Sequence, residues 1–223
     1  HHAVTAVIRG MANEIKNQLG GLRGAAQLLE RELPTEELKE FTQVIIDEAD
    51  RLQNLVDRML GPNTLPVKQL VNIHMVMERV RSLVRAEAPP GISVKFDYDP
   101  SIPDLNADPE QLIQAVLNLV RNALQALGEE GEIILRTRTQ RQFTIGHQRH
   151  KLVALIEVID KGPGIPEEML DTIFFPMITS RANGSGLGLS IAQSLMRRQG
   201  GLLECTSKPG KTVFQILLPL ATS

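Results

Sequence analysis

Two long helical patterns joined by one short turn constrain the first sixty residues more than any other feature does. Apolar residues recur at spacings of three and four on both sides of the turn, which is the period of an amphipathic α-helix. Pro34 and Thr35 form the turn, and Thr35 is a suitable N-cap for the second helix. We therefore predict helices over residues 3–33 and 36–60, folded into an antiparallel hairpin.

The apolar stripe of this hairpin is too broad to be buried by two helices alone. Two hairpins that pair into a four-helix bundle would bury it, so we predict a homodimer. The alternative is a hairpin that packs on the downstream part of its own chain. Gly20, Gly21 and Gly24 fall within the first pattern and cost about 1 kcal/mol each against alanine. We therefore expect close helix packing or a flexible point there.

A linker rich in proline and glycine follows the hairpin at residues 61–66. The sequence indicates a hairpin domain over 1–60, a linker over 61–68 and a second domain over 69–223. Helical and strand patterns alternate in the second domain, which predicts a two-layer α/β sandwich and an α+β chain overall. The expected helices cover residues 72–86 and 108–127, and the expected strands cover 92–98, 133–137, 152–159, 201–206 and 212–218. Residues 138–151 are interpreted as the tip of a hairpin with no part in the chemistry of the protein.

Composition narrows the function classes. The net charge of −2 does not favour a nucleic-acid or membrane surface, so neither is expected as a partner. The single cysteine, Cys205, fits a reducing cytosol and a buried position in a strand. The sequence has no apolar run of about 18 residues, and we expect a cytoplasmic protein.

Asp160 ends an apolar strand and is followed at once by Gly162 and Gly164. Glycine permits a close approach of a ligand to the backbone. A carboxylate in this position is able to accept a hydrogen bond from an exocyclic amine such as adenine N6. A tight turn after a strand would give the same pattern.

A second glycine cluster, Gly184, Gly186 and Gly188, leads into an amphipathic segment that begins with Leu187 and Leu189. Free backbone N–H groups and the positive end of a helix dipole favour phosphate there. No strand pattern comes immediately before this cluster, so it is a poor fit to a dinucleotide-binding fingerprint.

A pair of asparagines, Asn118 and Asn122, lies four residues apart on one face of the helix predicted over 108–127. Amide oxygens are suitable ligands for Mg²⁺. An ordinary solvated face would also carry such a pair.

Taken in chain order, the asparagine pair, the Asp160 stretch and the second glycine cluster resemble the N, G1 and G2 boxes of a histidine-kinase ATP-binding domain, the GHKL or Bergerat fold. Residues 173–176, Ile-Phe-Phe-Pro, resemble the F box, and the likeness extends over residues 70–218. It implies that ATP and Mg²⁺ bind at Asn118, Asn122, Asp160 and the glycine loops, with Asn122 as the magnesium ligand. It also implies a mobile lid over residues 174–184, in which Arg181 would meet a terminal phosphate.

The first helix carries a further likeness. Residues 13–19, Asn-Glu-Ile-Lys-Asn-Gln-Leu, resemble the H box of dimeric histidine kinases, His-Glu-x-x-Asn-Pro-Leu. Residues 20–29 and 121–127 are similar to nitrogen-regulatory sensor kinases of the NtrB type. This resemblance implies a response-regulator receiver domain of the NtrC type as a partner and a PII-type signalling protein as a second one. It also implies a sensory domain before residue 1.

Two positions of the H box depart from the family pattern. Asn13 stands where the family has the phosphoacceptor histidine, and Gln18 stands where it has proline. The imidazole is a nucleophile near neutral pH, whereas the nitrogen of a carboxamide is delocalised into its carbonyl. We therefore expect the autokinase step to be lost. The absence of proline should straighten the helix. Lys161 departs from the subgroup's usual asparagine, and ATP binding is expected to persist.

The reverse reaction does not need the histidine. Asn17 lies one turn after Asn13 on the same face, and its amide is able to orient water towards an aspartyl phosphate. Glu14 would act as an acid/base group or hold the partner. The sequence therefore predicts a phosphatase-competent, kinase-dead protein of this type.

Two other readings stay open. One is an ATP-hydrolysing dimer clamp of the GHKL class, which needs a further large domain after residue 218. The other is a non-catalytic pseudokinase module, in which the ATP domain is a regulated docking surface.

Overall fold

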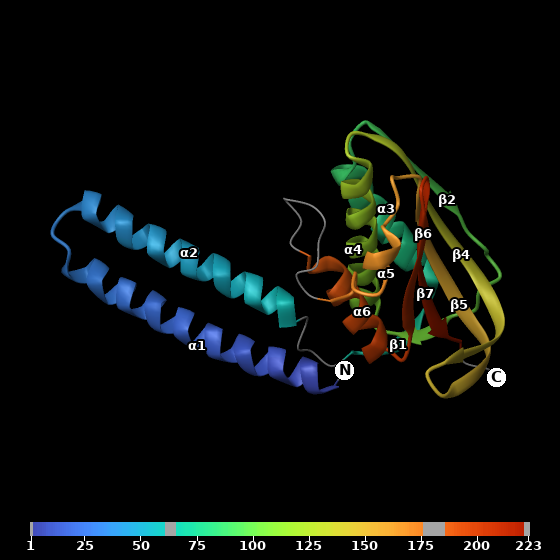
Figure 1. The fold of residues 1–223 in the computed structure, drawn as a ribbon, viewed down its shortest axis with the longest axis horizontal. Coiled ribbons are helices and arrows are strands. Elements are labelled where there is room, and N and C mark those ends of the chain that lie inside the picture. Colours follow the sequence, from blue (N-terminus) through green and yellow to red (C-terminus); the bar gives the residue numbers. More distant parts are fainter. Residues whose placement is uncertain (1, 61–65, 176–185, 221–223) are drawn as a thin grey trace. The chain divides into compact units, whose positions relative to one another are not determined.

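The computed structural model describes residues 2–60, 66–175 and 186–220. The chain divides into two compact units, His1–Asn63 and Thr64–Ser223, whose elements are labelled in Figure 1. Among the described residues, no helix has both the length and the apolar character needed to cross a membrane.

The first unit is a hairpin of α1 (His2–Glu32) and α2 (Glu36–Leu60). The backbone N–H of Leu38 donates to Oγ1 of Thr35 at 3.4 Å, so Thr35 caps α2 as predicted. An ion pair ties the helices together, with Nε of Arg23 lying 2.7 Å from Oδ1 of Asp50. Small and branched side chains fill the buried seam between the helices: Ala12, Leu19, Ala26, Thr42, Ile46, Ala49 and Val56.

A second apolar face of the hairpin remains exposed within this chain. Its side chains are between 40 and 69% exposed, and they are Met11, Ile15, Leu22, Leu28, Leu29, Leu38, Phe41, Val44, Ile45 and Leu52. This is the broad stripe that the sequence pattern predicted.

The glycines of α1 do not interrupt the helix, which continues from His2 to Glu32. A Cβ on Gly21 or Gly24 would meet nothing within 4 Å, and one on Gly20 would meet only Nε2 of Gln53, at 3.9 Å. The expected close packing at these glycines is therefore absent between the two described helices.

The second unit combines two sheets with four helices within the described residues. Its elements in chain order are β1 (Gln69–Val71), α3 (Ile73–Glu87), β2 (Gly91–Asp97), β3 (Leu105–Ala107), α4 (Pro109–Leu127), β4 (Glu130–Ile145), β5 (Gln148–Asp160), α5 (Glu167–Leu170), α6 (Gly188–Arg198), β6 (Leu202–Lys208) and β7 (Lys211–Pro219).

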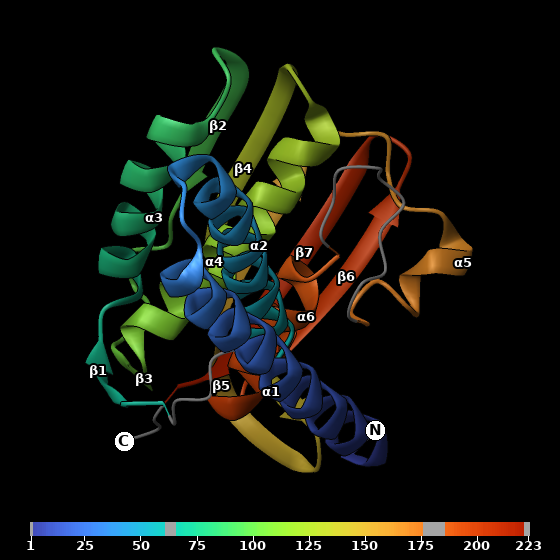
Figure 2. The ribbon, with the colours of Figure 1, turned by 90° about the vertical axis from the view of Figure 1, so that its left-hand side faces the viewer.

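The main sheet has the strand order β2-β4-β5-β7-β6, and β1 pairs with β3 in a separate small sheet. β2 and β4 run parallel, while the remaining neighbours are antiparallel. Figure 2 shows α3, α4 and α6 side by side over one face of this sheet, from the β2 side towards β6. This is the two-layer arrangement that the sequence predicted.

The core lies between these helices and the sheet. α4 turns Leu112, Val116 and Val120 inward at helical spacing, and none of the three is exposed. Alternate strand residues meet them, among them the fully buried Leu135 and Phe214. At roughly 25 cal/mol per Å² of buried apolar surface, this layer is the main source of stability for the unit.

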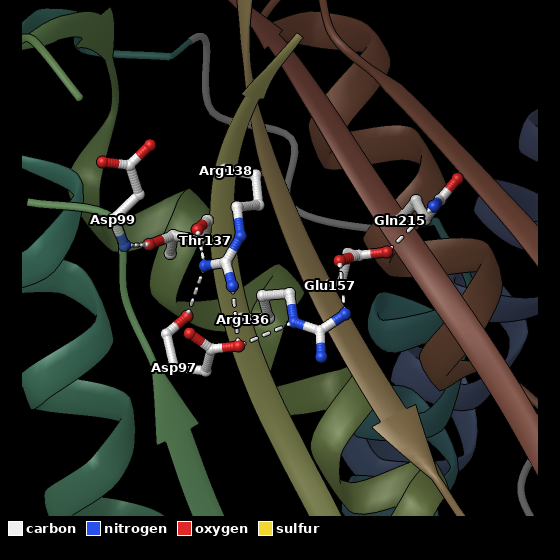
Figure 3. Close-up of polar contacts among 7 residues, drawn as sticks. All are labelled: Asp97, Asp99, Arg136, Thr137, Arg138, Glu157 and Gln215. Atoms are coloured by element: carbon white, nitrogen blue, oxygen red, sulfur yellow. Dashed lines mark hydrogen bonds and ion pairs between the residues drawn. The ribbon is translucent and has the colours of Figure 1, made fainter. Parts of the chain in front are cut away.

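The other face of the sheet carries a polar row, shown in Figure 3. Asp97 pairs with Arg138 at 2.7 Å and with Arg136 at 2.9 Å. Arg136 lies 3.7 Å from Glu157, which accepts a hydrogen bond from Gln215 at 3.0 Å. Hydrogen bonds from Arg138 and then Arg136 are the main causes that hold the pKa of Asp97 below its usual value. The polar row therefore links four of the five strands.

Sequence and structure agree on the fold class and differ in two details. β4 and β5 extend through the segment interpreted as a hairpin tip, so residues 138–151 are mostly paired strand around a turn at Gly146, where φ is 61°. The short β1 and α5 were not predicted. α1 shows no break at Gln18, as its missing proline led us to expect.

Candidate nucleotide site and phosphotransfer helix

Asp160 is the last residue of β5, a central strand, and only 1% of its surface is exposed. Its Oδ1 accepts a hydrogen bond from the backbone N–H of Gly162 at 2.9 Å. This bond fixes the carboxylate at the start of the glycine loop. Burial, and to a lesser degree the charge of nearby Asp160, raises the pKa of the Cys205 thiol on β6 to about 12. This thiol therefore stays protonated near neutral pH.

The loop after Asp160 is bound to the β6–β7 hairpin. Gly210 donates its N–H to the carbonyl of Gly162 at 3.0 Å, and Ile165 donates to Oγ of Ser207 at 2.8 Å. Gly164 has a φ of +88°, and a Cβ there would lie 2.9 Å from the carbonyl oxygen of Lys208. The position requires glycine, as the sequence pattern indicated.

Lys161 is not a free cation, because it is paired with Glu132 on β4. Nζ of Lys161 lies 2.5 Å from Oε1 of Glu132, and the backbone N–H of Lys161 donates to the carbonyl of Glu132. Lys95 also pairs with Glu132. Hydrogen bonds from Lys161 and then Lys95 lower the pKa of Glu132.

α4 brings the remaining motifs to this loop. A Cβ built on Gly188 would lie 3.9 Å from Cβ of Asn118, and one built on Gly162 would lie 3.6 Å from Cβ of Ala126. Asn118 and Asn122 are half-buried on the same helix. Gly188 therefore meets α4 one turn before Asn122, and Gly162 meets it one turn after Asn122.

The start of α6 has the features of an anion site. Leu187 is its buried N-cap residue, and its apolar side chain makes no capping hydrogen bond to the first turn. Gly186 precedes it with a φ of 63°. Oγ of Ser190 donates to the carbonyl of Leu187 at 2.9 Å and tightens the first turn.

Two expected site residues, Arg181 and Gly184, lie outside the described residues, as does most of the expected lid. Of the F-box segment, Ile173 is buried and Phe174 makes an edge contact with Phe214, with ring centroids 6.3 Å apart. That contact attaches the described end of the segment to the core.

α1, which carries the residues that resemble the H box, belongs to the other unit. Asn13, Glu14 and Asn17 are all exposed on α1, and Asn13 and Asn17 lie one turn apart on a continuous helix. Both amides are therefore open to a partner protein.

Within the described residues, no three His, Cys, Asp or Glu side chains gather closely enough to hold a metal ion. Beside the glycine loops, the described residues Asn118 and Asn122 carry amide oxygens, which suit Mg²⁺ when nucleotide phosphates complete its ligands.

Sequence reasoning missed a buried polar cluster at the other end of α4. Oδ1 of Asp108 caps α4 by accepting a hydrogen bond from the backbone N–H of Gln111 at 3.1 Å. Oδ2 of Asp108 accepts a hydrogen bond from the backbone N–H of Val67 at 2.8 Å. Gln199, 3% exposed, accepts from the N–H of Asp108 at 2.8 Å. A glutamine just before a Gly-Gly helix end was the available signal. This cluster joins the start of the unit to α4 and α6.

Comparison with known proteins agrees with this geometry. The model described as "Histidine kinase-, DNA gyrase B-, and HSP90-like ATPase" matches residues 107–222. The model described as "His Kinase A (phospho-acceptor) domain" matches residues 3–63.

Curated relatives match nearly the whole chain. A "Sensory histidine kinase/phosphatase NtrB" from Escherichia coli O157:H7 is 54% identical over 219 residues, covering 98% of this chain and 63% of the relative. The protein of the same description from Rhizobium meliloti is 40% identical, covering 97% of this chain and 59% of the relative. The chain thus spans about three fifths of the length of these relatives.

Solved structures share the fold. Full-length ShkA in complex with AMPPNP has a TM-score of 0.66 and 25% identity, covering 98% of this chain and 46% of that one. Histidine kinase ThkA in complex with response regulator TrrA has a TM-score of 0.62 and 24% identity, covering 98% of this chain and 61% of that one.

Proposed function

The chain belongs to the family of histidine kinase-, DNA gyrase B- and HSP90-like ATPases, and we propose that it is the core of an NtrB-like sensor histidine kinase/phosphatase. In this form the autokinase step is lost, while ATP binding and phosphatase activity towards a response regulator persist. The observation that carries the proposal is the meeting of both glycine motifs on α4, beside its two asparagines.

The residues present fit ATP. Asp160 is buried, and its carboxylate would accept a hydrogen bond from adenine N6. Gly162 must stay small for this, because a Cβ there would lie 2.7 Å from Oδ1 of Asp160. The N–H groups from Gly184 to Gly188 would hold the phosphates, and Arg181 would meet the terminal one. Asn118 and Asn122 would face Mg²⁺, with Asn122 as its ligand. ATP, when bound, supplies a transferable phosphoryl group.

Loss of the autokinase step follows from Asn13. A phosphoacceptor must present a lone pair to phosphorus, and an imidazole nitrogen does so near neutral pH. The amide nitrogen of Asn13 shares its pair with the carbonyl, so no phosphoramidate forms there. Asn13 is exposed, so burial is not the reason why this position would fail to accept a phosphoryl group.

Phosphatase activity requires only that water be oriented. The amide of Asn17 would hold a water in line with the aspartyl phosphate of the regulator. The water oxygen bonds to phosphorus, and the bond between phosphorus and the aspartyl oxygen breaks. The carboxylate leaves with the bonding pair, and the proton lost by water passes to phosphate or to Glu14. Glu14 otherwise serves to hold the partner.

The hairpin supports a homodimer. Ten large apolar side chains on α1 and α2 are exposed in a single chain, and a second hairpin would bury them in a four-helix bundle. The response regulator, of the NtrC type, would dock near Asn13 on the outside of that bundle. A PII-type protein is proposed as a second partner because the motifs resemble those of nitrogen-regulatory sensor kinases.

The decisive experiment measures phosphate incorporation from γ-labelled ATP with Mg²⁺, for the chain as given and for Asn13→His. Labelling of the histidine variant alone would support an intact ATP domain blocked only at Asn13. Labelling of the unaltered chain would contradict the assigned role of this position.

Asn13 also favours a second candidate, a non-catalytic pseudokinase module. The rate of phosphate loss from a phosphorylated regulator separates the two. Acceleration that disappears in Asn17→Ala supports the phosphatase. No acceleration, together with failure of Asn13→His to label, supports the module.

A further inference from the structure

The second unit contains another cleft, of about 1000 Å³, away from the nucleotide motifs. Its lining comes from the start of the unit, from the C-terminal end of α6 and from the β4–β5 turn. β5 runs from this cleft, at Gln148, to the nucleotide loop at Asp160, and α6 runs between the same two ends. At about 3.3 Å per strand residue and 1.5 Å per helix residue, the two sites are well separated.

The lining is basic. It contains Lys68, His147, His150 and Arg197, and no carboxylate. Nζ of Lys68 donates to the carbonyl of Gln199 at 2.9 Å, which fixes its ammonium group at the cleft. Among the residues that the structure describes, none of these four side chains forms an ion pair with a carboxylate.

The end of α6 accounts for only part of this charge. A helix C-terminus carries a partial negative charge of about half a unit, and cations stabilise it. The contact of Lys68 with Gln199 already serves that purpose. Arg197 adds a full positive charge, and the imidazoles of His147, in the β4–β5 turn, and His150, at the start of β5, add hydrogen-bond donors from a different part of the chain. The cleft therefore has more positive charge than the helix end needs.

We propose that this cleft binds a small polyanion, a molecule with two or more carboxylate or phosphate groups. One anionic group would contact Lys68 and Arg197, and another would contact His147 and His150. The side-chain amides of Asn106 and Gln148, which also line the cleft, would donate further hydrogen bonds. Because the lining takes Lys68 and Arg197 from the start of the unit and the end of α6, and the two histidines from the β4–β5 hairpin, a ligand with two anionic groups would use more of these side chains than one with a single group.

The test adds citrate or pyrophosphate to the 223-residue chain, without nucleotide or Mg²⁺, and follows backbone amide resonances and heat of binding. We expect the amides of Gly200 and Gly201 and those of the β4–β5 turn to shift, while those of Gly162 and Gly164 stay in place. Arg197→Gln and His150→Gln should each weaken binding about tenfold.

Arg141→Gln is the matched control, because Arg141 lies on the same strand pair but outside the lining, and it should leave the affinity unchanged. Thermal unfolding of each variant checks that the unit remains folded. Binding of citrate alone would assign a polycarboxylate, and binding of pyrophosphate alone a phosphate compound. No shift with either anion at millimolar concentration overturns the proposal, as does an equal loss in Arg141→Gln.

Discussion

Lys161 and Glu132 are joined twice, through Nζ and Oε1 at 2.5 Å and through the N–H of one and the carbonyl of the other. Lys161 follows the adenine-binding candidate Asp160 directly, so a lysine there raised the question of a phosphate contact. The pairing directs its ammonium group to β4 instead.

Replacing Lys161 should therefore change nucleotide affinity little. We expect Lys161→Asn to alter the dissociation constant of ATP by less than about fivefold, since an exposed ion pair contributes at most about 1 kcal/mol. Fluorescence titration with a labelled nucleotide measures this. Lys95→Asn, which removes the other partner of Glu132, is the control. A loss of tenfold or more in Lys161→Asn alone would show that the ammonium group contacts the nucleotide.

Gly164→Ala should damage both stability and nucleotide binding. The methyl group would approach the carbonyl of Lys208 at a φ of +88°, which we expect to cost about 2 kcal/mol. Gly146→Ala is the control, because its φ of +61° carries a similar strain while nothing lies within 4 Å. It should cost about 1 kcal/mol. Urea unfolding and ATP titration would distinguish them, and equal effects would argue against a tight loop.

Asp108→Ala should destabilise the second unit by about 2–3 kcal/mol. The change removes the N-cap of α4 and leaves the N–H of Val67 without its acceptor. Asp104→Ala, at an exposed position, should stay within about 0.5 kcal/mol. Chemical unfolding followed by circular dichroism measures both. A small effect of Asp108→Ala would mean that water replaces the lost bonds.

Asp97 should contribute to acid sensitivity. Its folded pKa lies below its ordinary value because of Arg138 and Arg136. The carboxylate therefore stabilises the fold above the unfolded pKa, about 3.9, and this contribution disappears as the pH falls through the folded pKa. The difference in Tm between the unaltered chain and Asp97→Asn should be largest near neutral pH and vanish in acid. A difference independent of pH would exclude charge pairing as its cause.

Phe41→Glu should dissociate the proposed dimer. Phe41 is 69% exposed on α2 within one chain, so a charge there is tolerated by the single hairpin but not by a paired one. Gln27→Glu, at an exposed polar position of α1, should leave the dimer intact. Analytical ultracentrifugation measures the mass. An unchanged mass for Phe41→Glu would place the interface elsewhere.

The sequence predicted the elements whose patterns are local. Helical spacing located α1, α2 and α4, and Asp160 with its glycines located the end of β5. The expected close packing at the glycines of α1 is absent between α1 and α2, because the free-energy cost of a glycine relative to alanine does not show which atoms lie beside it. β1 was missed because three residues carry no period. Gln199 was missed because its partner Asp108 is distant in the chain, and the Gly-Gly pair after Gln199 marks the helix end without revealing that contact.

The pairing of β5 with β7 has a consequence for how the molecule folds. β4–β5 and β6–β7 are hairpins between neighbours in sequence, whereas β5 meets β7 only after α5 and α6 have intervened. Distant pairings form later than local ones because more chain entropy is lost on closing the loop. Asp160 lies opposite Thr212 in that pairing, and Gly162 is bound to Gly210. The nucleotide loop therefore acquires its shape in a late folding step, and partly folded chains would lack it.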